Sequence, residues 1–170
     1  MAKKAKEWRV YKPKKTNDGA ASKLELSVKG KEIVGKDNKP LTIRVVNVFW
    51  VSAKQTGTDA NDNASFGWSD DDKSVTLKLG EVDLGEILAV LNNEKTITGA
   101  TEGNYKGIFH KNDKGSASFS IEKHAKGYNV RASKKIGAAA PVQITHQLTF
   151  GEAQILKQVV EAAVKQIYAW

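Results

Sequence analysis

The stretch Leu148-Thr149-Phe150-Gly151-Glu152 repeats, 66 residues later, the pattern of Val82-Asp83-Leu84-Gly85-Glu86. Each copy places an N-cap residue, Asp83 or Thr149, three positions before a glutamate, which is the spacing of a capping box at the start of a helix. A helical apolar pattern follows each copy, and a strand-rich stretch precedes it. The sequence therefore predicts one β-rich unit ending in a helix, made twice.

Turn signals and alternating apolar residues divide each unit into strands. In the first unit we expect strands over 8–12, 24–28 and 41–52, strand on both sides of the acidic turn 70–72, and a helix over 84–91. In the second we expect strands over 105–110, 117–121, 128–132 and 142–148, followed by a longer helix. The order β-β-β-β-α, made twice, predicts an α+β protein with two antiparallel four-stranded sheets, each backed by a helix, and excludes Rossmann and P-loop architectures.

Length and composition indicate a single globular domain. The 170 residues are 40% hydrophobic and 27% charged and include no cysteine, so disulfides and cysteine-based zinc sites are excluded. We expect residues 1–7 to form a disordered basic arm and residues 8–170 to form the domain, with repeats over about 8–93 and 94–170. No secretory signal is recognisable, so the cytoplasm of a bacterium or a phage-infected host cell is the expected location.

The net charge of +8 is unevenly distributed. Residues 1–15 carry a net +6, residues 16–93 a net −3, residues 94–135 a net +5, and residues 136–170 are neutral. Such basic patches favour a polyanionic partner, most often nucleic acid. The alternative is a solubilising tail together with a solvated charged face.

Little in the sequence supports catalysis. His110, His124 and His146 lie on different predicted strands without the spacing of metal ligands, and Asp70-Asp71-Asp72 is typical of a solvated turn. No serine lies in a nucleophile-elbow context. We therefore expect no enzyme, no metal and no cofactor.

Single-strand-binding proteins combine basic side chains for the phosphates with aromatic faces for the bases. The N-terminal strand and the strands of the second unit carry this combination, and two tryptophans of the first unit offer further aromatic faces. The candidate nucleic-acid-binding residues are Tyr11, Lys12, Lys14, Trp50, Trp68, Tyr105, Lys106, Phe109, Lys111, Tyr128, Arg131, Lys134 and Lys135. The alternative for each aromatic side chain, taken singly, is packing in the core.

The apolar stripe of the last helix is wide for a helix that covers only its own sheet. Ile155, Val159, Ala163 and Ile167 recur at helical spacing and are predicted to form an oligomer interface as well as core. Burial within the chain alone is the other interpretation.

The order of elements and two local stretches resemble the Whirly single-stranded DNA-binding proteins and, more distantly, the coactivator fold of positive cofactor four. Val10-Tyr11-Lys12-Pro13-Lys14, followed by Ala20-Ala21 and Leu26-Ser27-Val28, is similar to the Whirly stretch in which Val-Tyr precedes Lys-Gly-Lys-Ala-Ala-Leu. The helix from Thr149-Phe150-Gly151-Glu152 to Tyr168-Ala169-Trp170 is similar to the last helix of the family. Pro13 replaces the motif glycine, and residues 15–19 interrupt the motif before the alanines.

The resemblance implies a homotetramer that binds single-stranded DNA with little sequence preference, and we expect its source to be a phage or a bacterium. It implies a role in replication, recombination, repair or transcription without catalysis. Two alternatives remain open on the sequence alone: an RNA-binding or annealing protein on the same fold, and a structural or assembly protein that binds no nucleic acid.

Overall fold

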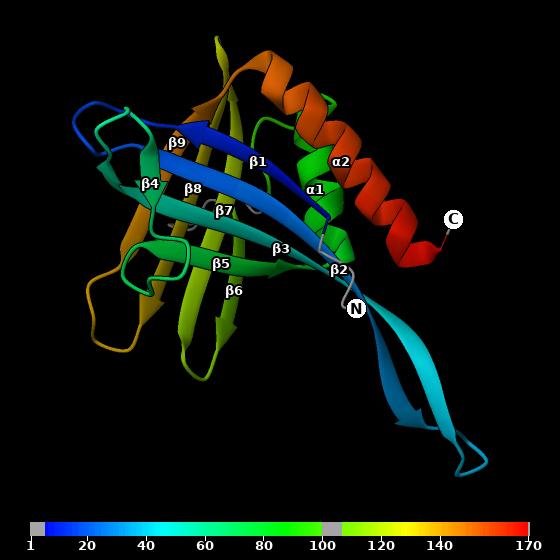
Figure 1. Cartoon of the computed structure of the whole chain (residues 1–170). Helices are drawn as coiled ribbons and strands as arrows, with labels where there is room; N and C mark the ends of the chain where they lie inside the picture. Colours follow the sequence, from blue (N-terminus) through cyan, green and yellow to red (C-terminus); the bar gives the residue numbers. More distant parts are fainter. Residues whose placement is uncertain (1–5, 100–106, 170) are drawn as a thin grey trace.

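The computed structural model describes residues 6–99 and 107–169, which form two antiparallel sheets and two helices (Figure 1). The first unit contains β1 (Lys6–Lys12), β2 (Ala20–Val34), β3 (Pro40–Thr58), β4 (Ala64–Phe66), β5 (Ser74–Leu79) and α1 (Glu81–Leu91). The second contains β6 (Ile108–Asn112), β7 (Gly115–His124), β8 (Gly127–Ile136), β9 (Val142–Leu148) and α2 (Phe150–Tyr168). The predicted fold class is confirmed. The first sheet has five strands rather than four, because the strands on both sides of the acidic turn, β4 and β5, pair with β3.

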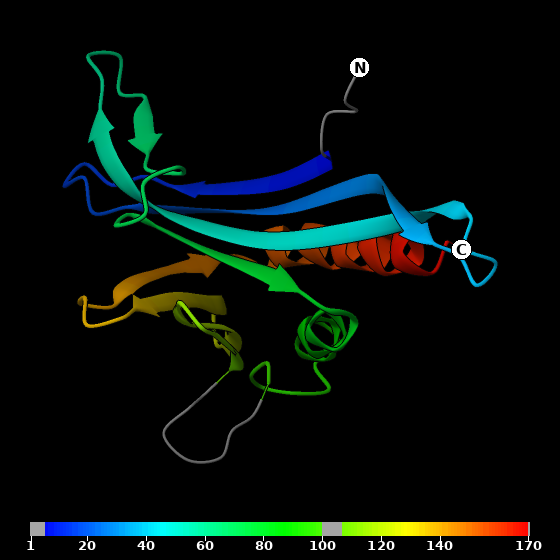
Figure 2. The same ribbon diagram turned by 90° about the horizontal axis from the view of Figure 1, so that it is seen from below.

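Sheet 1 is ordered β1-β2-β3, and the far edge of β3 pairs with both β4 and β5. Sheet 2 is the simple meander β6-β7-β8-β9. In Figure 2 sheet 1 runs across the molecule as one layer, with sheet 2 under one half of it and the helices under the other half. The two sheets and the two helices therefore enclose a shared apolar layer.

The core lies where the inner faces of the two sheets meet. Trp50 of β3 is fully buried, and its ring centroid is 4.6 Å from that of Phe119 on β7. Leu84 and Ile87 of α1, together with Leu156 of α2, are buried in the same cluster. Buried residues of both units therefore form one continuous cluster.

The long strands β2 and β3 extend beyond the rest of sheet 1. β1 pairs with β2 only as far as Leu26, and β5 pairs with β3 only from Val48 onward. Residues 27–34 and 40–47 continue as a two-stranded ribbon that projects from the body, as Figure 1 shows. We call residues 27–47 the β2–β3 arm.

The two helices begin differently, which corrects the predicted capping of the first one. Thr149 caps α2 as expected: its side chain accepts from the Glu152 backbone N–H at 3.2 Å, and the Glu152 carboxylate accepts from the Thr149 N–H at 2.8 Å. In α1 the N-cap is Gly80, and the carboxylate of Asp83 accepts from its N–H at 2.8 Å. Asp83 is thus the third helical residue rather than the cap, because the helix starts directly after β5.

Glu86 has a different role from the one predicted. Its carboxylate accepts from the Gly99 backbone N–H at 2.7 Å and from Lys95 Nζ at 2.5 Å, which ties α1 to the segment that follows it. The Lys95 hydrogen bond is the main reason that the pKa of Glu86 is lowered. The repeated sequence pattern therefore has a capping function only in its second copy.

Strand β1 begins earlier than predicted. Lys6 and Glu7 belong to β1 and pair with Leu26 and Glu25, so they are not disordered. Residues 1–5 lie outside the described part of the chain. Neither described helix is long and apolar enough to cross a membrane.

Candidate nucleic-acid interface

The outer face of sheet 2 is polar and basic. Because successive strand residues point to opposite faces, the register that turns Phe119, Ile121 and Val130 into the core turns their neighbours outward. The outward side chains of the four strands are Phe109, Lys111, Ser116, Ser118, Ser120, Glu122, Asn129, Arg131, Ser133, Lys135, Gln143, Thr145 and Gln147. We call this surface the sheet 2 face; hydroxyl, amide and cationic groups predominate on it.

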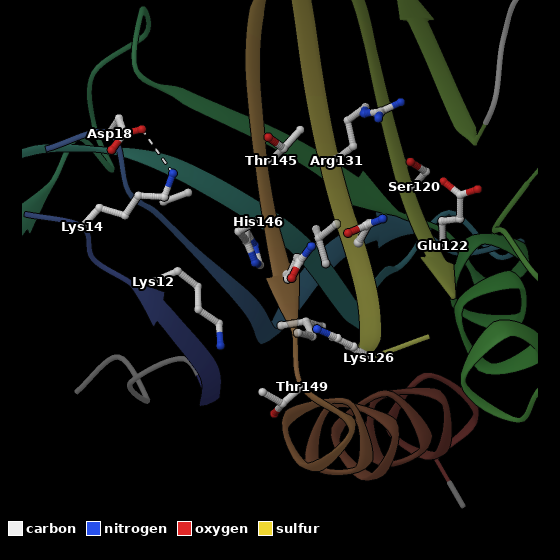
Figure 3. A pocket seen from close by; sticks show the side chains of 15 residues that line it. Lys12, Lys14, Asp18, Ser120, Glu122, Lys126, Arg131, Thr145, His146 and Thr149 are labelled. Atoms are coloured by element: carbon white, nitrogen blue, oxygen red, sulfur yellow. Dashed lines mark hydrogen bonds and ion pairs between the residues drawn. The ribbon is translucent and has the colours of Figure 1, made fainter. Parts of the chain in front are cut away.

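A pocket of about 640 Å³ continues the sheet 2 face past the edge strand β9 (Figure 3). Its lining includes the cations Lys12, Lys14, Lys126 and Arg131, against the acids Asp18 and Glu122. Lys14 Nζ lies 3.1 Å from Asp18, so part of its charge is already compensated. Lys126 and Arg131 supply the remaining positive charge, and we call this cavity the basic pocket.

Segments far apart in the sequence meet in the basic pocket. Lys12 and Lys14 come from the end of β1 and the turn after it, Lys126 from the turn between β7 and β8, and Thr149 from the start of α2. The β7–β8 turn requires Gly127, which has φ of 145° and packs so close to the Leu148 carbonyl that a Cβ atom would lie 2.1 Å from its oxygen. The close approach holds Lys126 beside the start of α2.

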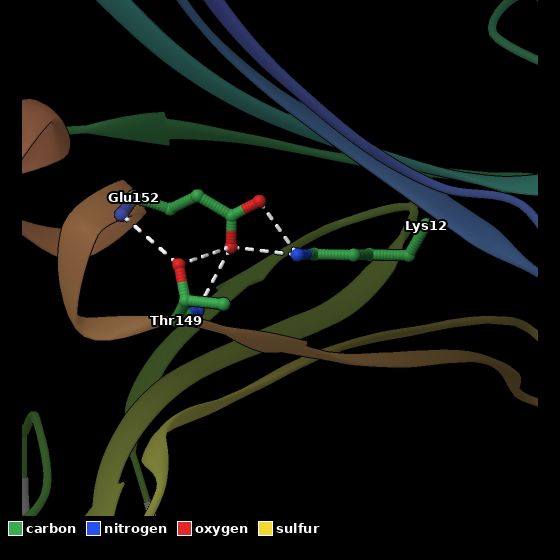
Figure 4. A network of polar contacts seen from close by, with 3 residues as sticks. All are labelled: Lys12, Thr149 and Glu152. Atoms are coloured by element: carbon green, nitrogen blue, oxygen red, sulfur yellow. Dashed lines mark hydrogen bonds and ion pairs between the residues drawn. The ribbon is translucent and has the colours of Figure 1, made fainter.

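Lys12 closes one side of the pocket by an ion pair. Its Nζ lies 2.6 Å from both carboxylate oxygens of Glu152, the residue that also completes the capping box with Thr149 (Figure 4). Burial alone would raise the pKa of Glu152, but the hydrogen bonds from Lys12 and Thr149 outweigh it and lower that pKa. Lys12 therefore joins β1 to α2, and its charge is largely neutralised by Glu152.

A buried polar chain lies behind the pocket and connects the two sheets. His146 Nε2 of β9 is 2.7 Å from Ser22 Oγ of β2, which is 2.7 Å from Ser52 Oγ of β3. Trp50 Nε1 donates to the same Ser52 hydroxyl at 2.9 Å. Burial is the main cause that lowers the pKa of His146 to about 4, so this imidazole is neutral near pH 7.

The outer face of sheet 1 carries aromatic rings with charged side chains beside them. Tyr11 lies 5.5 Å from Phe66 and 6.3 Å from Trp68, measured between ring centroids, and Lys23 Nζ lies 5.0 Å from the centre of the Trp68 ring. We call Tyr11, Phe66 and Trp68 the aromatic cluster. Ala21 and Ala53 lie on this outer face and are nevertheless fully buried, so the cluster covers the sheet.

The chain segment that contains Phe66 and Trp68 is acidic, although Arg9 donates to the Tyr11 hydroxyl at 3.1 Å and Lys23 lies over the Trp68 ring. Residues 59–72, which contain Phe66 and Trp68, carry five aspartates and no lysine or arginine. We call residues 59–72 the acidic end of sheet 1. Lys73 pairs with Asp70 at 3.4 Å, immediately after this segment.

The structure separates the sequence-predicted binding residues into groups. Lys14 and Arg131 line the basic pocket, and Phe109, Lys111 and Lys135 lie on the sheet 2 face. Tyr11 and Trp68 belong to the aromatic cluster at the other sheet. Tyr105 and Lys106 lie outside the described residues.

Two of the aromatic predictions are wrong. Trp50 is fully buried against Phe119, and Tyr128 is buried beside Phe150, with ring centroids 6.0 Å apart, so neither offers a face to a base. Lys134 points inward, and its Nζ lies 3.5 Å from Asp71. Alternation shows which residues share a face, but which face meets the other sheet is decided only when the sheets pack.

Sequence reasoning missed Lys126 and the hydroxyl and amide groups around it. Thr145, Gln147 and Ser120 alternate with core residues along β9 and β7, which is the signal that would have identified a polar strand face. Lys126 lies in a turn whose position relative to Lys14 depends on the packing of the sheets.

Part of the predicted oligomer interface is core. Ala163 is buried within the chain, whereas Ile155 is 58% exposed, and Val159 and Ile167 are half-buried. An apolar groove of about 340 Å³ runs beside them, lined by Trp8, Leu24 and Leu26 of sheet 1 and by Ile155, Val159 and Ala162 of α2.

Metal chemistry finds no support in this geometry. Within residues 6–99 and 107–169, no three histidine, aspartate or glutamate side chains converge as a metal site would require. Polar contact with a polyanion is what the basic pocket and the sheet 2 face can provide.

Comparison with solved structures identifies the architecture. WHY3 from Arabidopsis thaliana superposes with a TM-score of 0.68 at 13% identity, covering 100% of this chain and 92% of that one. The chain has the Whirly fold. The plant transcriptional regulator PBF-2 matches with a TM-score of 0.67 at 15% identity, covering 100% of this chain and 86% of the other.

The Whirly fold extends beyond the plant structures. MRP1/MRP2 of Trypanosoma bruciei match with a TM-score of 0.58 at 15% identity, covering 97% of this chain and 95% of theirs. No protein-family model matches this sequence, and no curated protein matches it. The likeness is thus one of fold, and it agrees with the resemblance found in the sequence.

Proposed function

We propose that this protein binds single-stranded nucleic acid, with DNA as the first candidate, across the sheet 2 face and into the basic pocket. The observation that carries the proposal is the basic pocket, in which Lys126 and Arg131 add positive charge beside the hydroxyl and amide groups of β9. Cations bind phosphates, and hydroxyl and amide groups accommodate sugars and base edges. The Whirly fold supports this proposal, since PBF-2 is a transcriptional regulator.

The charge distribution favours sheet 2 over sheet 1 as the binding surface. The sheet 2 face carries Lys111, Arg131 and Lys135 against Glu122. The segment that contains Phe66 and Trp68 carries five aspartates, and the cations at the aromatic cluster, Lys23 and Arg9, already contact its rings. Phosphates approaching the acidic end would be repelled, and this repulsion acts over about 10 Å at 0.1 M salt. Phe109, 45% exposed on the sheet 2 face, supplies an aromatic surface on which a base can stack.

The proposal is tested by fluorescence anisotropy with labelled dT oligomers at several salt concentrations. We expect Arg131→Ala combined with Lys135→Ala to weaken binding roughly tenfold. The slope of log affinity against log salt should become shallower by about 0.7 for each phosphate that the variant no longer neutralises. Lys78, exposed on the outer face of β5, provides the matched control, and Lys78→Ala should leave affinity unchanged.

Three results would contradict the proposal. Affinity for dT that does not change with salt would exclude phosphate contacts, and equal affinity for duplex would exclude a preference for single strands. Absence of binding to any oligonucleotide by the folded protein would favour the structural or assembly role. Competition between DNA and RNA strands of equal length decides between DNA binding and the RNA-binding or annealing alternative, because the hydroxyl-rich sheet 2 face can also contact a 2′-OH.

We further propose that the protein is a homotetramer acting in replication, recombination, repair or transcription, with the exposed side of α2 at the subunit interface. Ile155 and the apolar groove beside it expose aliphatic surface that a second α2 would cover. Light scattering of the purified protein measures the mass, and Ile155→Asp should reduce it. Gln154→Asp, on an exposed position of the same helix turn, is the matched control.

A further inference from the structure

The β2–β3 arm contacts α2 through Arg44, which donates to the Gln166 backbone carbonyl at 2.5 Å and to the Gln166 side-chain oxygen at 2.6 Å, and from there it projects away from the body (Figure 1). Both edges of the ribbon are unpaired among the described residues, because β1 begins at Lys6, opposite Leu26, and β5 ends at Leu79, opposite Val48. Val34 and Leu41 are 73% and 52% exposed. A two-stranded ribbon without a packed face is only marginally stable in water, so the exposed part of the arm would gain stability by packing against a partner.

The β2–β3 arm is basic, and its composition favours a protein partner over nucleic acid. Residues 27–47 carry five basic and two acidic side chains, for a net charge of +3, and contain no aromatic residue. The arm has no aromatic ring on which a base could stack, so it lacks one of the two features that single-strand-binding surfaces combine. Its exposed aliphatic side chains are instead suited to packing against protein.

The opposite end of sheet 1 has the complementary charge. The acidic end, residues 59–72, carries a net charge of −5. The β2–β3 arm and the acidic end lie at opposite ends of the long axis of sheet 1 in both Figure 1 and Figure 2. They are therefore too far apart to meet within one copy, but each is accessible to a neighbouring copy.

We propose that the β2–β3 arm of one copy of this chain docks against the acidic end of sheet 1 in a second copy. The two surfaces are different, so the contact is head-to-tail and can repeat from copy to copy. This contact is separate from the proposed α2 interface, in which the same surface of both subunits meets. Copies bound along one strand of nucleic acid would then touch at their ends.

Charge-reversal variants test this contact on the full chain in the absence of nucleic acid. The arm variant combines Lys31→Glu with Lys36→Glu, and the acidic-end variant combines Asp71→Lys with Asp72→Lys; all four side chains are exposed. Sedimentation velocity at low salt should show association of the unmodified protein beyond its basal oligomer, reduced at least fivefold by raising the salt to 0.5 M. Each variant alone should lose this association.

Mixing the two variants is the decisive measurement. An equimolar mixture provides contacts at which the reversed arm of one variant meets the reversed acidic end of the other, so association should return to the level of the unmodified protein. The control Lys78→Glu with Lys114→Glu reverses two exposed charges elsewhere and should associate normally. Ile155→Asp should lower the basal mass and leave the salt-sensitive association in place, which separates the two interfaces.

Several outcomes would overturn the proposal. The proposal is wrong if the unmodified protein shows no association beyond the basal oligomer at any concentration. It is also wrong if only one of the two variants loses the association, or if their mixture stays dissociated. If the arm variant binds dT oligomers at least fivefold more weakly while its association is unchanged, the arm contacts nucleic acid and the docking proposal is wrong.

Discussion

The outer faces of the two sheets differ although both belong to the same repeated unit. On sheet 1 the aromatic cluster covers Ala21 and Ala53, Lys23 lies over the Trp68 ring, and the five aspartates of the acidic end lie nearby in the sequence. On sheet 2 the outer face is an open layer of hydroxyl, amide and cationic groups that leads into the basic pocket. In the first unit, aromatic rings beside basic residues thus pack over the sheet and stabilise the fold. The second unit carries the exposed positive charge that suits a ligand.

The largest expected effect is the loss of folding stability in acid, through His146 in the buried polar chain between the two sheets. The pKa of His146 is lowered to about 4 in the folded chain from an ordinary value of 6.5, so between these pH values the unfolded chain binds more protons. Stability is complete above pH 6.5 and is expected to fall by about 3 kcal/mol as the pH drops to 4. Urea unfolding at pH 7, 5.5 and 4.5 measures the loss.

A substitution pair tests whether His146 is the cause. In His146→Gln the loss of stability between pH 6.5 and 4.5 should be much smaller, whereas His124→Gln, which retains the buried imidazole of His146, should show the full loss. An equal loss in both variants would assign the acid sensitivity to other groups.

The division of labour between the two outer faces is tested by Trp68→Ala. Removing this ring takes away its packing against Tyr11 and Phe66 and the position of Lys23 above it. We expect a decrease of about 2 kcal/mol in stability, from the ring packing and the cation–π pair, with no change in affinity for dT. Arg131→Ala should leave stability unchanged and weaken dT binding. If folded Trp68→Ala binds dT more weakly, the binding surface lies on sheet 1.

The smallest expected effect is the difference in stability loss between substitutions at the starts of α2 and α1. Thr149→Ala removes a side-chain cap and should cost about 1 kcal/mol. Asp83→Ala removes the bond to the Gly80 N–H and the 3.0 Å contact with His110 Nε2, and the loss of these partly exposed contacts should cost about 0.5 kcal/mol. Thermal unfolding of both variants measures the order, and a larger decrease for Asp83→Ala would show that α1 depends on its first turn more than α2 does.

Local patterns predicted most of the elements because they report alternation and helical spacing directly. Strands β7 and β9 and helix α2 lie close to where these patterns place them, and β3 begins where predicted but continues beyond residue 52 to Thr58. The start of α1 was misplaced because an aspartate suits the cap and the third helical position equally well, and a glycine cap has no side-chain signal. The ends of β2 were misplaced because pairing with β3 continues through Lys29, Gly30 and Lys31, where apolar alternation stops.

By itself, the sequence determined the doubled β-β-β-β-α order, the concentration of positive charge in the second unit and the capping of α2, since each depends on residues close together in the chain. Tertiary structure alone decided that Trp50 and Tyr128 are core, and that Lys14 meets Lys126 and Arg131 in one pocket. The reason is physical: alternation shows which side chains share a face, but burial and convergence depend on which faces meet. More than 100 residues separate Lys14 from its partners in the pocket, and only the packing of the two sheets brings them together.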